Sequence, residues 1–282
     1  MGTQLYAPEN ALMRLLRRFN QNIPLSVDEL PVVRQLGWEI RAVRRRQTID
    51  TVGIKHRLAY FVIDGFLMRY RTVRDGRRQI VNLAIPGDFV GNPSCYNAIH
   101  SIKALTNATI AAVPLARLAG LYETEPRLAA KIFWSFSSDA AMQAEHLAVV
   151  GQRPALERIA HFLLELHVRL QMVGEADEYS FRFPFSQKVI GDALGLSLAY
   201  VNRSLRRLAD ENLVKIEGQS VVFGDLEQLS ALADFDRSYL RPLPIVEVAR
   251  ESSIEALAEW DGKGLAGVRV NDLPSLSSRH WF

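Results

Sequence analysis

The 282-residue sequence predicts an α+β protein in which a β-roll is followed by a long helix and then by a winged helix-turn-helix. Three observations predict this order. Short β-rich runs separated by turn residues occupy residues 38–114, a stretch free of Gly and Pro follows Pro126, and two short helical patterns meet at Gly195. We therefore expect a β-domain and a small helical unit joined by one long helix.

Composition places the chain among ordinary globular proteins. It is 48% hydrophobic and 23% charged, and 282 residues are enough for two domains. The one cysteine, Cys95, cannot form an internal disulfide, which favours a reducing cytoplasm and excludes a disulfide-stapled secreted protein. No run approaches the roughly 20 apolar residues that cross a bilayer, so we expect no membrane contact. The net charge of +3 permits a polyanionic partner without requiring one.

The first half of the chain is predicted to form a short helical segment and the β-roll. We assign residues 1–24 to an N-terminal helical segment and residues 25–125 to the roll, which opens with a helix over residues 28–36. Strands are expected at the runs EIRAV, TIDTV, LAYFVI, FLMRYRTV, RQIVNLAI and ATIAAV. Asp75-Gly76 separates two of these runs and predicts a hairpin.

A long helix is predicted over residues 126–152. The stretch of about 24 residues before Gly151 would span roughly 36 Å. Six of its residues recur at spacings of three, four or seven and form one mostly apolar stripe, which on a long linking helix favours pairing with a second copy. The alternative is a helix buried inside its own subunit. The residues predicted to form the homodimer contact are Leu128, Ile132, Phe136, Gln143, Leu147 and Val150.

Residues 153–240 are assigned to the winged helix-turn-helix. Its two short helices are expected over residues 187–194 and 198–210. Gly195 can adopt the left-handed conformation that ends the first helix, and Ser197 can cap the second. Gly191 leaves room for the two helices to cross. The apolar residues expected to form the core between them are Ile190, Leu194, Val201, Leu205 and Leu208.

Positive charge is concentrated on this unit. Between residues 182 and 208 there are five basic residues and one acid, whereas residues 209–217 hold three acids and one lysine. A surface that faces phosphates needs such a concentration, because neutralised phosphates release counterions. A charge run alone indicates only a solvated helix face, but together with the turn chemistry it predicts double-stranded DNA as the partner. The runs LVKI and SVVF around Gly218 predict a wing that reaches the sugar-phosphate backbone.

Four features now follow one another in a familiar order: the β-roll, the loop PGDFVG at residues 86–91, the long helix, and the segment SQKVIGDALGLSLAYVNRSLRRLADENLVKIEGQSVVF. Over residues 25–240 the chain resembles the Crp/Fnr family of bacterial transcription regulators. The resemblance implies a cyclic-nucleotide-binding-like roll that senses a signal and a long helix that pairs two subunits. It also implies a winged domain that binds a near-palindromic operator and contacts RNA polymerase.

Two signatures of this family are missing. In relatives that bind cyclic nucleotides, a Glu of the loop holds the ribose and an Arg-Ser or Arg-Thr pair holds the phosphate. Here Asn92 replaces the Glu, and Ile99 and His100 stand where the Arg pair would fall, so we expect no tight binding of cyclic AMP. An iron–sulfur cluster needs several thiolates, and the chain has one cysteine. We predict no cofactor and no metal.

Another effector would bind in the altered loop region. The residues predicted at that pocket are Gly87, Asp88, Gly91, Asn92, Cys95 and His100. Cys95 is either a redox switch or a small buried apolar group.

The start of the second short helix also departs from the family, whose members commonly present Arg-Glu or Glu-x-x-Ser there. This sequence has Leu198 and Ala199 and keeps Arg203. Arg203 can contact guanine in a bidentate manner, Asn202 can pair with adenine, and an apolar side chain can touch a thymine methyl. The predicted DNA-binding residues are Ser186, Gln187, Ser197, Leu198, Ala199, Tyr200, Asn202, Arg203, Arg206 and Gly218.

No pattern in the sequence indicates catalysis. There is no phosphate-binding loop, no GxSxG and no HExxH, and we predict that the protein is not an enzyme. The alternative to a DNA-binding regulator is a signal-binding module that acts through protein partners and carries a vestigial winged domain. Residues 241–282 lie beyond the resemblance, and this tail is either loosely packed or covers part of the dimer or the roll.

Overall fold

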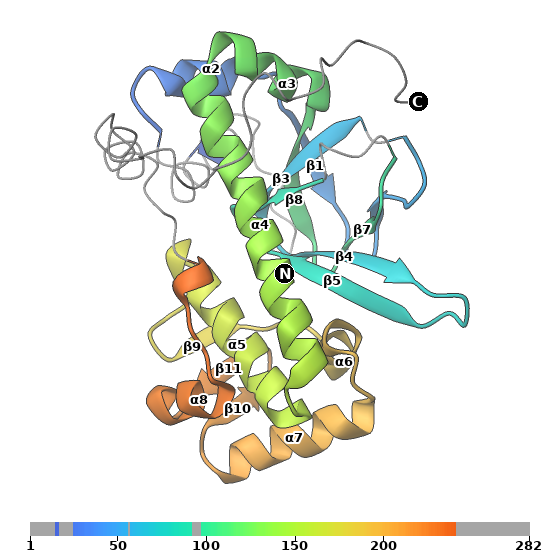
Figure 1. Cartoon of the computed structure of the whole chain (residues 1–282), viewed down its shortest axis with the longest axis vertical. Coiled ribbons are helices and arrows are strands. Elements are labelled where there is room, and N and C mark those ends of the chain that lie inside the picture. Colours follow the sequence, from blue (N-terminus) through green and yellow to red (C-terminus); the bar gives the residue numbers. More distant parts are fainter. Residues whose placement is uncertain (1–14, 17–24, 56, 92–96, 241–282) are drawn as a thin grey trace, which may run out of the picture. The chain divides into compact units, whose positions relative to one another are not determined.

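The computed structural model describes residues 15, 16, 25–55, 57–91 and 97–240 (Figure 1). The predicted N-terminal segment lies outside the described residues, except for the helical Leu15 and Leu16. Asn92, Cys95 and the tail over residues 241–282 also lie outside them. Within the described residues, no helix has both the length and the apolar character that crossing a membrane requires.

The predicted β-roll consists of two four-stranded antiparallel sheets, in the orders β1-β8-β3-β6 and β2-β7-β4-β5 (Figure 1). Helix α2 (Glu29–Gln35) precedes them. The strands are β1 Glu39–Val43, β2 Thr48–Asp50, β3 Leu58–Asp64, β4 Leu67–Thr72, β5 Arg78–Ala84, β6 Phe89–Val90, β7 Ser101–Ala104 and β8 Ala108–Pro114. All six predicted strands are present, and β4 and β5 pair as the hairpin that Asp75-Gly76 indicated.

Strand β3 contributes to two separate cores because its side chains alternate between the two faces of its sheet. Tyr60 and Val62 pack inside the roll. Phe61 and Ile63 pack on the other face with residues of α3 (Leu115–Thr124) and α4 (Pro126–Gln152). Side chains on one face of this sheet therefore fill the interior of the roll, and helices cover the other face.

Three short strands are not predicted from the sequence. Strand β6 has two residues and β7 has four, which is too few for an alternating pattern to be recognised. Strand β9 (Ser180–Arg182) pairs with β11 and extends the predicted wing to three strands. All three short strands lie directly beside longer strands that the sequence does predict.

Helix α4 has the predicted bounds, but the predicted stripe divides: its first residues face the roll, whereas Leu147 is 76% exposed and stays a predicted contact. Leu128 and Ile132 are 0% and 4% exposed, and both pack in the core between roll and helices. The Phe136 ring lies 5.5 Å from the Phe89 ring of β6. The prediction that Leu128 and Ile132 contact a second copy is therefore wrong, because these side chains are already buried against the roll. Gln143 donates a hydrogen bond to Asp139.

A second stripe of α4 faces solvent. Phe133 and Leu147 are 59% and 76% exposed, and four small residues lie on the same face between and beyond them. Successive members are four and three residues apart in alternation, which is the repeat of a two-helix coiled coil. The exposed stripe consists of Phe133, Ser137, Ala140, Ala144, Leu147 and Gly151.

The remaining elements form the winged helix-turn-helix. Helix α5 (Ala155–Met172) is buried along most of its length, and its buried side chains belong to the core of the domain. The other elements are α6 Gln187–Leu194, α7 Leu198–Asp210, β10 Val214–Glu217, β11 Ser220–Phe223, α8 Leu226–Ala233 and the 3₁₀ helix η1 Ser238–Leu240. All five apolar residues predicted for the core of the helix pair are buried.

Candidate nucleic-acid interface

The turn between α6 and α7 has the geometry that its residues predict. Gly195 has φ 66° and ends α6 in the left-handed conformation. Ser197 Oγ accepts a hydrogen bond from the Tyr200 backbone N–H at 3.4 Å. A Cβ atom on Gly191 would lie 2.7 Å from the Leu196 carbonyl oxygen, so only glycine lets the two helices approach this closely.

Helix α7 is buried on one face and exposed on the other. Val201, Leu205 and Leu208 are buried in the domain core. Arg203 and Arg206 are exposed, and the Arg203 guanidinium carbon lies 4.5 Å from the centre of the Tyr200 ring, as in a cation–π contact. The face opposite the core therefore presents two guanidiniums to solvent.

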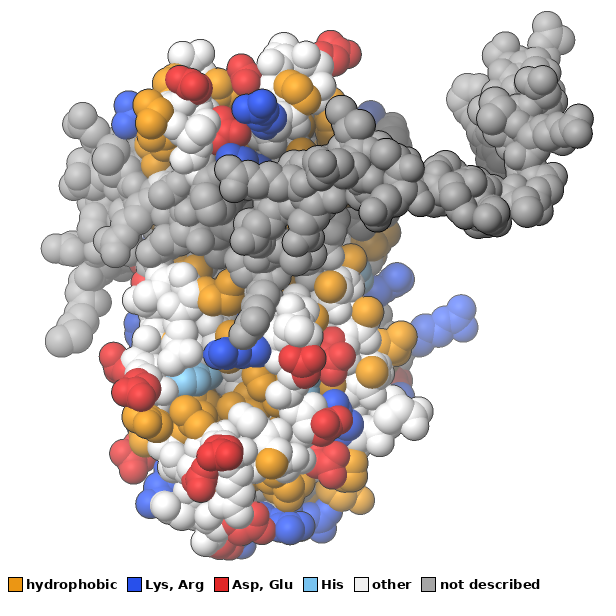
Figure 2. Space-filling view, turned by 60° about the vertical axis from the view of Figure 1, so that its left-hand side comes forward, with side chains coloured by type: hydrophobic (Ala, Val, Ile, Leu, Met, Phe, Trp, Pro, Cys, Tyr) orange, Lys and Arg blue, Asp and Glu red, His pale blue; other side chains and the backbone are white. Residues whose placement is uncertain are grey.

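The other predicted DNA-binding residues surround this face. All of them are exposed except Gln187, which is half-buried. A groove of about 420 Å³ lies between α6, α7 and β10, and Gln187, Asn202 and Arg206 line it. Gly218 has φ 62° at the tip of the β10–β11 hairpin. In the view of Figure 2, basic side chains lie at the lower end of the molecule together with acidic ones. The structure thus leaves the predicted residues accessible on the outer face of the helix-turn-helix and at the tip of the wing.

The predicted effector pocket is only partly within the described residues. Gly87 and Gly91 are buried and have positive φ values of 100° and 126°. The Asp88 carboxylate accepts a hydrogen bond from the Ile85 backbone N–H at 2.8 Å and forms an ion pair with Arg169 at 2.6 Å. The cavity beside Asp88 has about 70 Å³, which is small next to the roughly 300–1,000 Å³ of ligand pockets.

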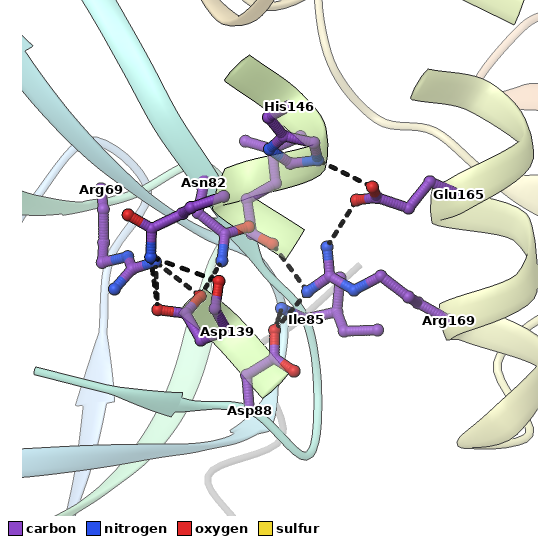
Figure 3. Close-up of polar contacts among 10 residues, drawn as sticks. Arg69, Asn82, Ile85, Asp88, Asp139, His146, Glu165 and Arg169 are labelled. Atoms are coloured by element: carbon purple, nitrogen blue, oxygen red, sulfur yellow. Dashed lines mark hydrogen bonds and ion pairs between the residues drawn. The ribbon is translucent and has the colours of Figure 1, made fainter. Parts of the chain in front are cut away.

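A chain of buried charges links this loop to the DNA-binding domain (Figure 3). Arg169 of α5 contacts Asp88 of the roll and also Glu165 at 3.5 Å. Glu165 accepts a hydrogen bond from His146 of α4 at 2.7 Å. Burial opposes ionisation of Glu165, but His146 and Arg169 outweigh it and lower the pKa of that carboxyl to about 2. Burial likewise opposes the charge on His146, and the Glu165 carboxylate still raises the pKa of that imidazole.

A second buried cluster lies where α4 crosses the roll (Figure 3). Arg69 of β4 donates to both carboxylate oxygens of Asp139, at 2.6 and 2.7 Å. Asn82 of β5 donates to the same carboxylate at 2.6 Å. Arg69, Asp139 and Arg169 are not among the residues predicted from the sequence. The sequence around the arginines carries no distinctive signal, because Arg71 follows Arg69 in its strand and Glu165 and His167 precede Arg169 in its helix.

The comparisons with known proteins agree with this architecture. Residues 157–232 match the family described as Crp-like helix-turn-helix domain, and residues 40–125 match the family described as cyclic nucleotide-binding domain. The chain is 30% identical over 174 residues to the nitrogen fixation regulation protein FixK of Bradyrhizobium diazoefficiens, covering 62% of this chain and 73% of that protein. It is 25% identical to the transcriptional activator protein FnrL of Cereibacter sphaeroides, covering 72% and 83% of the two chains.

A solved structure shows the same fold. FixK2 from Bradyrhizobium japonicum superposes with a TM-score of 0.65 and 26% sequence identity, over 69% of this chain and 96% of that chain. The matched domains, the relatives and the exposed helix α7 lead to one conclusion. This chain belongs to the Crp/Fnr family of DNA-binding transcription regulators.

Proposed function

We propose that the protein regulates transcription as a homodimer that binds a near-palindromic operator and contacts RNA polymerase in the cytoplasm. The observation that carries this proposal is the outer face of α7, where Arg203 and Arg206 are exposed and form no ion pair within the described part of the chain. Arg207 differs, because it is held by Glu211 at 2.7 Å. An exposed face with two uncompensated guanidiniums fits a major groove lined by phosphates.

The two arginines have different roles in this proposal. Arg203 lies one turn into α7, where a recognition helix reads base edges, and Arg206 lies beside the wing. Ser186, Gln187, Ser197 and Tyr200 surround the amino-terminal ends of α6 and α7, which suits phosphate contacts. Leu198 and Ala199 are placed for thymine methyl groups, and Asn202 for adenine.

Arg203→Ala is expected to weaken operator binding by about 1–3 kcal/mol and to relax the preference at one base pair. Arg206→Ala is expected to weaken binding to every sequence alike, because a phosphate contact carries no sequence information. Gel-shift titrations on the operator and on single-base variants measure both effects. If Arg203→Ala keeps wild-type affinity and base preference, the assignment of Arg203 is wrong.

The exposed stripe of α4 supports the homodimer. Its small residues, Ala140 and Ala144 among them, allow two helices to approach closely, and Leu147 supplies an apolar contact. A dimer on this stripe would present its two recognition helices to half-sites about 34–36 Å apart. The proposed contact face is therefore the stripe from Phe133 to Gly151, which shares Leu147 with the predicted stripe and leaves out the buried Leu128 and Ile132.

Salt dependence separates a DNA-binding regulator from a module that acts only through protein partners. Several phosphate contacts give a slope of several units when the logarithm of affinity is plotted against the logarithm of salt concentration. Fragments recovered by genome-wide footprinting of bound DNA supply the duplexes for this measurement. A slope near zero on all of them would support the partner-only function.

We also propose that the protein binds neither cyclic AMP nor an iron–sulfur cluster, holds no metal, and catalyses no reaction. His100 supports the first point. Burial lowers the pKa of this imidazole, and the nearby Arg69 and Arg71 lower it further, so it is neutral at pH 7. A neutral imidazole cannot give a cyclic phosphate the charge-assisted contacts of an arginine.

Titration calorimetry with cyclic AMP at pH 7 is expected to show no binding in the micromolar range. The same titration with His100→Arg tests whether one restored guanidinium is enough to recover affinity. Micromolar binding by the wild-type protein would contradict the proposal.

A further inference from the structure

An apolar cavity lies outside the β-roll, between the roll and the DNA-binding domain. Its volume of about 440 Å³ is within the roughly 300–1,000 Å³ of ligand pockets. Strand β5 and helices α4, α5 and α6 all contribute to its lining. None of its described lining residues belongs to the core inside the roll or to the predicted effector pocket beside Asp88. The cavity is therefore a separate site.

Most of the side chains that line the cavity are apolar, and they come from every element around it. Ile80 and Leu83 belong to β5, Val150 belongs to α4, and Leu194 belongs to α6. Protein interiors are close-packed, and atoms that face a void lose the dispersion contacts that a filled space would give them. The lining therefore favours an occupant with an apolar body.

The cavity offers no free charge to a ligand. Its described lining holds no Asp, Glu, Lys or Arg, and its ionisable side chains are two histidines. His146 is paired with the Glu165 carboxylate at 2.7 Å. His161 is neutral at pH 7, because burial lowers the pKa of its imidazole to about 4. A charged ligand would lose its hydration here without gaining a partner of opposite charge. We therefore expect a neutral occupant.

The hydrogen-bond donors of the lining are engaged with other groups of the protein. Gln79 donates to the Ala193 carbonyl at 2.8 Å, and Gln143 donates to Asp139 at 2.8 Å. The Asn82 amide also donates to Asp139, at 2.6 Å (Figure 3). A ligand that needs a donor from these three side chains would have to break a contact that the protein already makes.

Two buried atoms of the lining residues lack a hydrogen-bond partner within the described part of the chain, and these are Asn82 Oδ1 and His161 Nε2. Buried polar atoms in folded proteins almost always have a partner. An amide oxygen can only accept, and Nε2 of a neutral imidazole accepts when Nδ1 carries the proton. A hydroxyl or N–H group on the occupant can supply the missing donor. Water can supply it too, but water does not fill the apolar space.

We propose that this cavity binds a small neutral molecule with an apolar body and one hydroxyl or N–H donor, and that this molecule is an effector. A molecule bound there touches the roll, the long helix α4 and the first helix of the helix-turn-helix. It therefore stabilises the arrangement of these parts that fits it best. The effector role rests on the proposed function, whereas the binding of the molecule does not.

The test uses N-phenylnaphthylamine, a neutral aromatic fluorophore with one N–H group and brighter emission in apolar surroundings. Full-length protein is expected to bind one molecule of this probe per subunit in the micromolar range. Anilinonaphthalene sulfonate has the same rings and the same N–H group but adds a negative charge. It is expected to displace the neutral probe only at concentrations about tenfold higher, because the cavity has no free cation to receive the sulfonate.

Ala193→Leu adds three carbons to the lining from α6 and is expected to weaken binding of the neutral probe by about tenfold. Ala231→Leu is the matched control, because it makes the same change at an exposed position of α8 outside the cavity. Val150→Phe fills the cavity from α4 and replaces Ala193→Leu if that variant does not fold. Circular dichroism checks the folding of each variant.

Gel-shift titrations on the footprinted operator, with and without the neutral probe, test the effector role. The probe is expected to change operator affinity about fivefold or more in the wild type and in Ala231→Leu, and to leave the filled variant unchanged. If the probe does not bind the wild type, or binds the filled variant equally well, the inference is wrong.

The remaining outcomes separate the effector role from the proposed function. If the probe binds in the cavity and operator affinity stays the same, the ligand site stands and the effector role is wrong. If no protein binds the operator with or without the probe, the proposed function fails, and the fluorescence titrations still decide whether the cavity binds a neutral ligand.

Discussion

Arg169→Ala is expected to lower the free energy of unfolding by about 3–5 kcal/mol, the usual cost of removing one partner of a buried ion pair. The Arg169 side chain is 6% exposed and lies between the carboxylates of Asp88 and Glu165, and it also donates to the Leu83 carbonyl at 3.1 Å. Alanine would leave two carboxylates in the interior without their guanidinium. The loss should appear as a shift of the urea midpoint, measured at pH 7.

Arg207→Ala is the matched control for this experiment. It also removes an arginine that pairs with a glutamate four residues away, but Arg207 is exposed. Such surface pairs contribute about 0–1 kcal/mol. Adding Asp88→Asn to Arg169→Ala should recover part of the loss, because one uncompensated carboxylate is then removed. If Arg169→Ala costs no more than Arg207→Ala, Asp88 and Glu165 are solvated and the buried charge chain does not stabilise the fold.

The helix-turn-helix could be predicted from the sequence because its determinants are local. Gly191, Gly195 and Ser197 lie within seven residues of one another, and each acts on the backbone around it. The structure confirms the turn, the cap and the buried core of the helix pair. The β4–β5 hairpin was predictable for the same reason, since Asp75-Gly76 determines the turn by itself.

The contacts of α4 could not be predicted, because they depend on residues far away in the sequence. The stripe that starts at Leu128 and the stripe that starts at Phe133 both have helical spacing, and spacing alone does not say which surface covers which stripe. Only the packing of β3 and β6 against α4 shows that Leu128, Ile132 and Phe136 of the first stripe face the roll. The Arg169–Asp88 pair joins residues 81 positions apart, and nothing local marks either residue as a partner of the other.

His161 makes the unfolding free energy depend on pH in the acid range. Its side chain is 1% exposed, and its Nε2 forms no hydrogen bond with the described part of the chain, although a Glu145 oxygen lies 3.4 Å away. Burial lowers the pKa of this imidazole, and Arg153 and His146 lower it further against the opposing charge of Glu165, to about 4. The unfolded chain therefore binds a proton near the ordinary histidine value of about 6.5, whereas the folded protein does not bind it until about pH 4.

The stability that His161 contributes as a neutral group is complete above pH 6.5 and is lost as the pH falls towards 4. The loss amounts to about 3 kcal/mol at 1.36 kcal/mol per pKa unit. His161→Phe keeps an aromatic ring beside Phe235 and Tyr239 but removes the titration. The difference in unfolding free energy between wild type and His161→Phe should then be constant above pH 7 and change by about 3 kcal/mol between pH 6.5 and 4 in favour of the variant.

Taking this difference separates His161 from the other ionisable groups that titrate nearby. Burial also lowers the pKa of His167, and Glu165 raises that of His146, but both histidines are present in the two proteins compared. Urea unfolding at half-unit intervals from pH 8 to 4 measures the difference directly. A difference that stays constant over this whole range would show that the imidazole is protonated in the folded protein near pH 6.5, and hence that water reaches the side chain.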